Sequence, residues 1–348
     1  MSPYMLLMFS SILILGTMIT LSSSHWLFAW TGLEINTFAI IPFMAQKNHP
    51  RALEATLKYF IIQITAAIML LYSSTLNAWL SGQWEIQHMM YPAPLMLATM
   101  ALALKMGLAP LHAWYPEVLQ GLDFKVGLIL STWQKLAPLA LFIQISHEYS
   151  ILYIILGLTS ILMGGWGGLN QTQLRKILAY SSIAHLGWII LIVHYLPSIT
   201  FLLFLIYVTM TFTLFLTLYY MFSTSINSLS TSWAKAPILT SMLPFTFFSL
   251  GGLPPFTGFI SKWIILNELT KQNLILVATI AALSALLSLF FYLRLSYAVA
   301  FTTPPNNLSA MLPWRFPFFF SPLFLTLSIM ISSFSLPLSP SLLAFFLF

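Results

Sequence analysis

Residues 107–114 read GLAPLHAW, and residues 252–259 read GLPPFTGF, 145 positions further along the chain. Each stretch places glycine and proline in the middle of an unusually long apolar segment. Proline lacks the N–H group that a helix uses, and its ring clashes with the preceding turn, so each segment is predicted to be a helix broken near its middle. The backbone groups freed at such a break need partners from the protein or from internal water.

The composition around these two stretches fits only one class of protein. Charged residues make up 6% of the 348 residues, against about 25% in a typical soluble domain, and hydrophobic residues make up 59%. So few charges could not cover the surface of a soluble fold, and the same figures exclude disorder, coiled coil and collagen. Apolar runs such as residues 151–163 do not alternate with polar residues, as the strands of a membrane barrel do. The predicted fold class is an all-α polytopic membrane protein.

The apolar stretches predict about eleven transmembrane helices, at roughly 30 residues for each helix with its loop. Clusters of serine, glycine, asparagine and proline separate them, as is typical of turns. The longest polar loops are expected at about 223–236 and 303–317. The predicted spans are residues 3–22, 25–45, 52–80, 92–120, 125–145, 149–168, 174–195, 198–222, 237–267, 273–302 and 322–345.

The two broken helices occupy matching places in this row, as the fourth of the first five spans and the fourth of the next five. A unit of five helices points the opposite way when it is repeated, because five is odd. The chain is therefore predicted to hold two inverted five-helix repeats, residues 1–148 and 149–303, followed by a loop and a C-terminal transmembrane helix, residues 304–348. The alternative is that glycine and proline are simply frequent in membrane helices. The breaks are expected near 107–110 and near 251–255, at Gly107, Pro110, Gly251, Pro254 and Pro255.

The loop charges predict an orientation in the membrane. One set of connections is rich in lysine and arginine, whereas the opposite set contains only Lys271. Basic loops stay on the side from which a membrane protein inserts, so the N-terminus is predicted on the positive side and the C-terminus on the other. The basic loop residues are Lys47, Arg51, Lys125, Arg175, Lys176, Lys235 and Arg315.

Several ionisable residues fall near the predicted middle of the membrane. A charge there costs roughly 2.5–3.5 kcal/mol, unless such residues face one another, face internal water or become neutral. Lysine can release its proton in a protein, whereas arginine does not, so a row of lysines with a glutamate partner indicates a proton path. The two histidines in the set could equally donate to a backbone carbonyl. The candidate residues are Glu34, Lys105, Lys135 and Lys262, together with His112 and His185.

The remaining charged residues in the spans have simpler interpretations. Lys58 follows Glu54 by four residues, which indicates an ion pair at a helix end. Arg294 is expected to extend toward the membrane surface or to pair locally. Glu117 is expected to lie at the level of the lipid headgroups.

The residue types and motifs that are missing exclude several functions. The chain has no cysteine, which excludes a thiolate metal site and a cysteine-ligated iron–sulfur cluster. It contains neither a G-x-G-x-x-G nor a G-x-x-x-x-G-K-[ST] nucleotide fingerprint. The basic residues are dispersed, so the net charge of +6 does not indicate a nucleic-acid partner. We therefore expect no metal, no cofactor, no redox centre and no ATP hydrolysis in this chain.

Four stretches of the chain resemble a known family. Residues 174–188 read LRKILAYSSIAHLGW and residues 105–117 read KMGLAPLHAWYPE. These two are similar to the antiporter-like subunits of respiratory complex I, which are related to the large subunits of multi-subunit cation/proton antiporters. Residues 131–138, STWQKLAP, and residues 32–36, GLEIN, narrow the resemblance to the short form found in animal mitochondria.

The resemblance runs from the first span to the last and implies a role for each candidate residue. Glu34 and Lys105 match the paired glutamate and lysine of the first half-channel. Lys135 matches the central lysine that links the two halves, and Lys262 matches the titratable residue of the second half-channel. His112 and His185 match polar residues of the central hydrophilic axis. Larger relatives carry three further helices at the start, which this chain would lack.

The resemblance also implies a setting for the chain. It implies a proton-pumping module of a hetero-oligomeric NADH–ubiquinone oxidoreductase in the mitochondrial inner membrane, with the N-terminus in the matrix and the C-terminus on the intermembrane-space side. NADH, FMN, iron–sulfur clusters and ubiquinone would lie in or at other subunits. The implied partners are the other membrane-arm and accessory subunits and membrane lipids such as cardiolipin.

Two other interpretations stay open on the sequence alone. The fold equally allows an independent cation/proton antiporter, because such antiporters share the inverted repeat with broken helices. A purely structural membrane subunit is also allowed, and there the buried lysines would form paired scaffolding.

Overall fold

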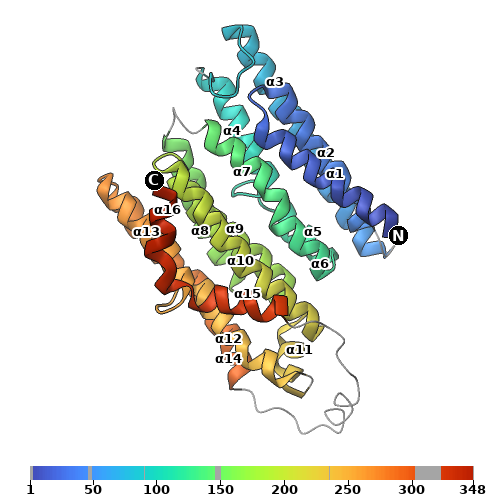
Figure 1. Ribbon diagram of the computed structural model, residues 1–348, viewed down its shortest axis with the longest axis vertical. Helices are drawn as coiled ribbons and strands as arrows, with labels where there is room; N and C mark the ends of the chain where they lie inside the picture. Colours follow the sequence, from blue (N-terminus) through green and yellow to red (C-terminus); the bar gives the residue numbers. More distant parts are fainter. Residues whose placement is uncertain are drawn as a thin grey trace. The chain divides into compact units, whose positions relative to one another are not determined.

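The structure is a computed structural model that describes residues 3–45, 49–89, 91–145, 150–234, 236–301 and 323–347. Within these ranges the regular elements are helices, apart from two isolated bridges that pair His25 with Glu85 and Gln173 with Ser225 (Figure 1). The predicted all-α class is therefore confirmed. Lys47, Lys235 and Arg315, which contributed to the predicted charge pattern of the loops, lie outside the described residues.

The helices follow one another with short connections. In chain order they are α1 (Pro3–Ser22), α2 (Trp26–Met44), α3 (Pro50–Ser81), α4 (Pro92–Met106), α5 (Trp114–Gly121), α6 (Phe124–Ser131), α7 (Trp133–Ile145), α8 (Ser150–Gly168), α9 (Leu174–Val193), α10 (Pro197–Met221), α11 (Ile226–Ser230), the 3₁₀ helix η1 (Thr231–Ala234), α12 (Pro237–Gly251), α13 (Thr257–Lys271), α14 (Ile275–Ala300), α15 (Leu323–Phe334), the 3₁₀ helix η4 (Leu336–Leu338) and α16 (Ser339–Leu347).

Proline and glycine set several of these helix ends. Proline stands in the first turn of α3, α4, α10 and α12, where its missing N–H is tolerated because no helical acceptor exists there. Glycine in the left-handed conformation ends three helices: Gly82 after α3 with φ 72°, Gly107 after α4 with φ 76°, and Gly252 after α12 with φ 74°. A side chain at these positions would strain the backbone.

Helix breaks are present at both predicted places. The gap between α4 and α5 contains Gly107 and Pro110, and the gap between α12 and α13 contains Pro254 and Pro255. Gly251, which we predicted as part of the second break, is instead the last residue of α12. The left-handed residue that ends this helix is the next one, Gly252.

The number of spans depends on how broken helices are counted. In the described part of the chain, eight helices are long and apolar enough to cross a membrane, and the bent helical stretch from Leu323 to Phe345 raises the number to nine. The first halves of the two broken helices, α4 and α12, have 15 residues each and fall short alone. The expectation of eleven spans counts each broken helix once and stays a prediction.

Two segments differ from the sequence-based expectation. The stretch expected as a polar loop at 223–236 contains α11 and η1, and α11 begins with a capping box in which Ser225 and Ser228 exchange hydrogen bonds. The C-terminal helix, expected to be continuous, bends by 67° after α15. Pro337 lies in the bend, where it removes a helical donor.

The described helices group into two compact units, Met1–Ser160 and Ile161–Phe348. In the first unit α2 packs against α1 and α3, α3 packs against α4 and α5, and α7 packs against α4 and α1 (Figure 1). In the second unit α10 packs against α9, α12 and α15, and α12 packs against α13 and α14. The predicted repeat boundaries at residues 148 and 303 stay a prediction.

Candidate functional site

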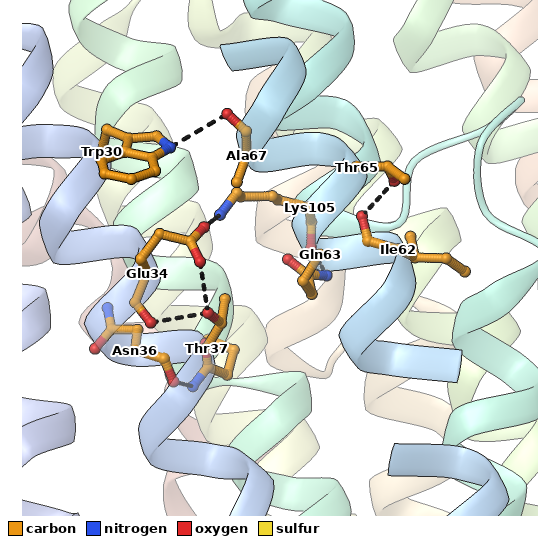
Figure 2. A network of polar contacts seen from close by, with 10 residues as sticks. Trp30, Glu34, Asn36, Thr37, Ile62, Gln63, Thr65, Ala67 and Lys105 are labelled. Carbon is orange, nitrogen blue, oxygen red and sulfur yellow. Dashed lines mark hydrogen bonds and ion pairs between the residues drawn. The ribbon is translucent and has the colours of Figure 1, made fainter. Parts of the chain in front are cut away.

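A buried ion pair joins α2 to α4 in the first unit. Lys105, in the last turn of α4, donates from Nζ to Oε1 of Glu34 in α2 at 3.3 Å (Figure 2). The two side chains are only 2% and 13% exposed, respectively. Removing one member of such a pair leaves the other charge buried without its partner, at a cost of about 3–5 kcal/mol. The resemblance paired these two residues, and the structure brings them together.

Polar groups surround both members of this pair. Oγ1 of Thr37, one turn after Glu34, donates to the Glu34 carbonyl at 2.8 Å and lies 3.4 Å from its Oε2. Nε2 of Gln63 in α3 donates to the backbone carbonyl of Lys105 at 3.5 Å. Trp30, one turn before Glu34, donates from its indole nitrogen to the Ala67 carbonyl at 3.2 Å and ties α2 to α3 (Figure 2). Contacts within α2 and from α3 thus fix the positions of Glu34 and Lys105.

The second lysine of this unit lies against an aromatic ring. Lys135 on α7 is 2% exposed, and its Nζ is 4.3 Å from the centre of the Tyr115 ring on α5. An ammonium at this distance is attracted to the face of the ring. This contact depends on the helix break. Gly107 has no side chain, so Tyr115 can pack closely against the backbone at the break; a Cβ at Gly107 would stand 3.2 Å from the Cβ of Tyr115.

Lys105 and Lys135 line the same internal cavity. Its volume is about 10 Å³, which is close to the space that one water molecule needs. Amide and hydroxyl side chains also line it, from Asn36, Thr37, Gln63 and Gln134. A cavity with several polar partners holds water, whereas an apolar cavity of this size stays empty. The first unit therefore places two buried lysines, one of them paired with Glu34, at the wall of one polar cavity.

Lys262 lies at the break of the second unit. Its Nζ on α13 donates to the carbonyl of Gly251, the last residue of α12, at 2.6 Å. The carbonyl end of a helix carries partial negative charge and favours a cation. Gly252 makes this contact possible, because a Cβ there would lie 2.9 Å from Nζ of Lys262. In each unit, then, a lysine lies near the C-terminal end of the first half of the broken helix.

The structure brings His185 close to Lys262. Both line a cavity of about 10 Å³ within the second unit, together with Tyr207 and Ser261. Nε2 of His185 on α9 is 3.4 Å from the hydroxyl of Tyr292 on α14. This cavity has an imidazole, an ammonium and two hydroxyl groups at its wall, and such groups can exchange protons with an internal water.

The structure does not bring His112 into either cavity. It lies in the gap between α4 and α5, half-buried, and hydrogen-bonds with the backbone of Pro110. Its backbone carbonyl accepts the N–H of Tyr115 at 3.0 Å. Both of these contacts of His112 lie at the break itself.

The charged residues with simpler predicted interpretations also have defined partners. Nζ of Lys58 lies 2.8 Å from Glu54, as the four-residue spacing predicts, and 2.7 Å from Glu117 on α5. We expected Glu117 only at headgroup level, so this link between α3 and α5 is new information from the structure. Arg294 on α14 does not pair with a neighbour in the sequence: its Nη1 donates to the carbonyl of Leu169, 125 positions earlier, at 2.9 Å.

Sequence reasoning missed several residues that surround the candidate sites. Gln63 is 4% exposed in the middle of α3. Burying an amide side chain costs free energy, so a glutamine inside an apolar span could have been recognised as a candidate. Gln134 stands next to Lys135 and donates to the Asn36 carbonyl at 3.1 Å. Tyr115 and Tyr292 gave no such signal, because tyrosine is common in membrane proteins as an interface anchor. Among the described residues, no three His, Cys, Asp or Glu side chains come together as a metal site would require.

The sequence matches two family profiles over most of its length. A profile described as "NADH:quinone oxidoreductase/Mrp antiporter, TM" matches residues 23–288. A second profile, described as "NADH dehydrogenase subunit 2 C-terminus", matches residues 289–343.

Individual relatives agree with these profiles. The chain is 64% identical over 315 residues, or 90% of each chain, to a protein of Tetraodon nigroviridis named NADH-ubiquinone oxidoreductase chain 2. Among solved structures, it resembles a chain of respiratory complex I from Thermus thermophilus at 27% identity and a TM-score of 0.77, over 93% of this chain and 78% of that one. It also has the fold of a chain in the Mrp complex of a Dietzia species, at 18% identity and a TM-score of 0.74, over 85% of this chain and 60% of that one.

Proposed function

The chain belongs to the antiporter-like membrane subunits of NADH:quinone oxidoreductases and Mrp antiporters, and on this premise we propose that it moves protons within the membrane arm of respiratory complex I. The resemblance found in its motifs is thereby confirmed. The observation that carries the proposal is the buried Glu34–Lys105 pair, whose lysine lines a polar cavity together with Lys135. The chain acts as one subunit of an NADH:ubiquinone reductase that translocates protons.

The first step of the proposed path is release of a proton from Lys105. The carboxylate of Glu34, 3.3 Å away, stabilises the ammonium form of the lysine. When the two side chains separate, the ammonium is left in a buried site without its counter-charge, which favours loss of its proton. The cavity at Lys105 also reaches Lys135, so one water held by its amides and hydroxyls is sufficient to carry the proton between the two lysines.

Lys262 is the proposed acceptor of the second unit. The Gly251 carbonyl holds its ammonium at the end of α12, and its cavity also contains the imidazole of His185. We assign Lys262 to release on the far side of the membrane and His185 to proton exchange within the same cavity. His112 is assigned to the break, where it supports the position of Tyr115.

The redox chemistry belongs to other subunits in this proposal. NADH, FMN, the iron–sulfur clusters and ubiquinone lie elsewhere in the complex, and ubiquinone reduction there changes the charge state along this chain. The partners are the other membrane-arm and accessory subunits and membrane lipids, cardiolipin among them. The setting is the mitochondrial inner membrane, with the N-terminus in the matrix and the C-terminus toward the intermembrane space.

The test is a pair of lysine substitutions in the assembled complex. Lys105→Met removes the proton carrier, and we expect fewer protons pumped for each NADH oxidised while the complex still assembles. Lys58→Met is the matched control, since Lys58 is 41% exposed and lies outside the cavity. Unchanged pumping in an assembled Lys105→Met complex would refute the proposed path. Loss of assembly together with full pumping in the remaining complex would instead support a structural role for the pair.

A further inference from the structure

A large apolar cavity opens between α12 and α14 in the second unit. Its volume is about 540 Å³, within the range of roughly 300–1,000 Å³ that small-molecule sites occupy. α12 and α14 pack against each other beside it (Figure 1). The wall is almost entirely apolar, and it includes the exposed rings of Phe290, Tyr297 and Phe301 and the side chain of Phe248.

One charged residue, Arg294, lies in this apolar wall. Its Nη1 donates to the Leu169 carbonyl, which occupies one of the five N–H donors of the guanidinium. Within the part of the chain that the structure describes, no carboxylate forms an ion pair with it. The cavity therefore offers an apolar space with a cation that has donors to spare.

The depth of Arg294 fits the level of lipid headgroups. It lies six residues before the end of α14 at Ala300, or about 9 Å along the helix. Near that end, the indole nitrogen of Trp233 donates to the Val299 carbonyl at 2.5 Å. Tryptophan is enriched where the membrane meets water, and arginine at a helix end extends toward the same level.

We propose that this cavity binds one anionic phospholipid, with an acyl chain against the rings of α12 and α14 and the phosphate at the Arg294 guanidinium. The apolar wall matches a hydrocarbon chain, and a planar guanidinium binds phosphate through two parallel hydrogen bonds. The site rests on the proposed function only because it requires these helices to lie in a membrane.

The proposed lipid would touch α12, the helix whose last carbonyl accepts the hydrogen bond from Lys262. The ring of Phe248 lines the cavity, and the carbonyl of Phe248 accepts the N–H of Leu253 at 3.2 Å where α12 ends. The Gly251 carbonyl that binds Lys262 belongs to the same turn. Occupancy of the cavity would thus support the end of α12.

The experiment is photolabelling of the purified, intact complex with two probes, phosphatidylglycerol and phosphatidylcholine, that carry the same diazirine-bearing acyl chain. We expect labelled peptides from α12 and α14, with about fivefold more label from the anionic probe, as one basic residue near a membrane surface provides. Arg294→Gln should remove the preference for the anionic probe but leave the labelling itself. Arg294→Lys should keep most of that preference. NADH oxidation by the same particles reports the proposed function separately.

Two further substitutions test whether the cavity itself is occupied. Ala300→Trp fills the cavity and should abolish labelling at Phe248, whereas Leu283→Trp, at an exposed position on the same helix, should not. Equal labelling by both probes would overturn the proposal, because it would show that bulk membrane lipid fills the cavity without selection for its headgroup. Absence of label in the unsubstituted complex would overturn it as well, because a protein segment would then fill the cavity.

Discussion

Gly252 and Gly82 offer a matched pair of substitutions that tests how Lys262 is positioned. Both glycines end a helix in the left-handed conformation, with φ 74° and 72°, so alanine costs about 1–2 kcal/mol of backbone strain at either position. Nothing lies within 4 Å of the methyl group that alanine would add at position 82. At position 252 the same methyl would stand 2.8 Å from Cδ and 2.9 Å from Nζ of Lys262.

The extra cost at position 252 falls on the lysine. Carbon atoms prefer separations of about 3.5–4.0 Å, so the flexible end of Lys262 must move away from the new methyl group. That movement breaks the 2.6 Å hydrogen bond to the Gly251 carbonyl. Hydrogen bonds to charged groups contribute about 1.5–3 kcal/mol, so Gly252→Ala should destabilise the subunit by that amount more than Gly82→Ala does.

The assay compares the two variants in the intact complex. Thermal stability of the purified particle and protons pumped for each NADH oxidised are measured side by side. We expect Gly82→Ala to pump like the unsubstituted complex and Gly252→Ala to lose pumping along with stability. Equal pumping by both variants would refute the reasoning, since it would mean that Lys262 does not depend on the end of α12.

Three further predictions follow from the buried contacts. Glu34→Gln leaves Lys105 charged and unpaired, so it should destabilise the subunit by about 3–5 kcal/mol, and adding Lys105→Met should restore thermal stability but not pumping; two independent, additive losses would contradict the pair. Lys262→Arg keeps the positive charge, but arginine does not release its proton, so pumping should fall while the complex still assembles; normal pumping would remove Lys262 from the path. Gly258→Ala places a methyl group 1.7 Å from the Ser249 carbonyl oxygen, so the complex should fail to assemble on native gels; assembly at the normal level would show that α12 and α13 can move apart.

Much of the architecture was predictable from local chemistry. The apolar run lengths predict helices, and glycine with proline predicts the two breaks, because both effects act within one turn of the chain. The bend after α15 was equally visible at Pro337, but the length of the predicted span, residues 322–345, favoured one continuous helix. Charged residues inside apolar spans marked Glu34, Lys105, Lys135 and Lys262 as candidates, because burial of a charge is costly wherever it occurs.

Several contact partners of the charged and polar residues could not be predicted from the sequence. Glu117 looked like a residue of the headgroup level, yet it pairs with Lys58 on another helix at 2.7 Å. Tyr115 and Tyr292 carry no charge, so nothing in the sequence distinguished them from packing residues. Only the arrangement of helices places Tyr115 under Lys135 and Tyr292 beside His185.

Residue types and their spacing were enough to predict that this protein is helical, lies in a membrane, is interrupted at two glycine–proline segments and carries buried lysines. These properties depend on residue type and on spacing along one helix, which the chain states directly. Helix packing is what places Lys105 and Lys135 at one cavity, joins Lys262 to the end of α12 and gives Lys262 a cavity in common with His185. Such contacts join residues far apart in the chain, and their geometry follows from how whole helices pack rather than from any local pattern.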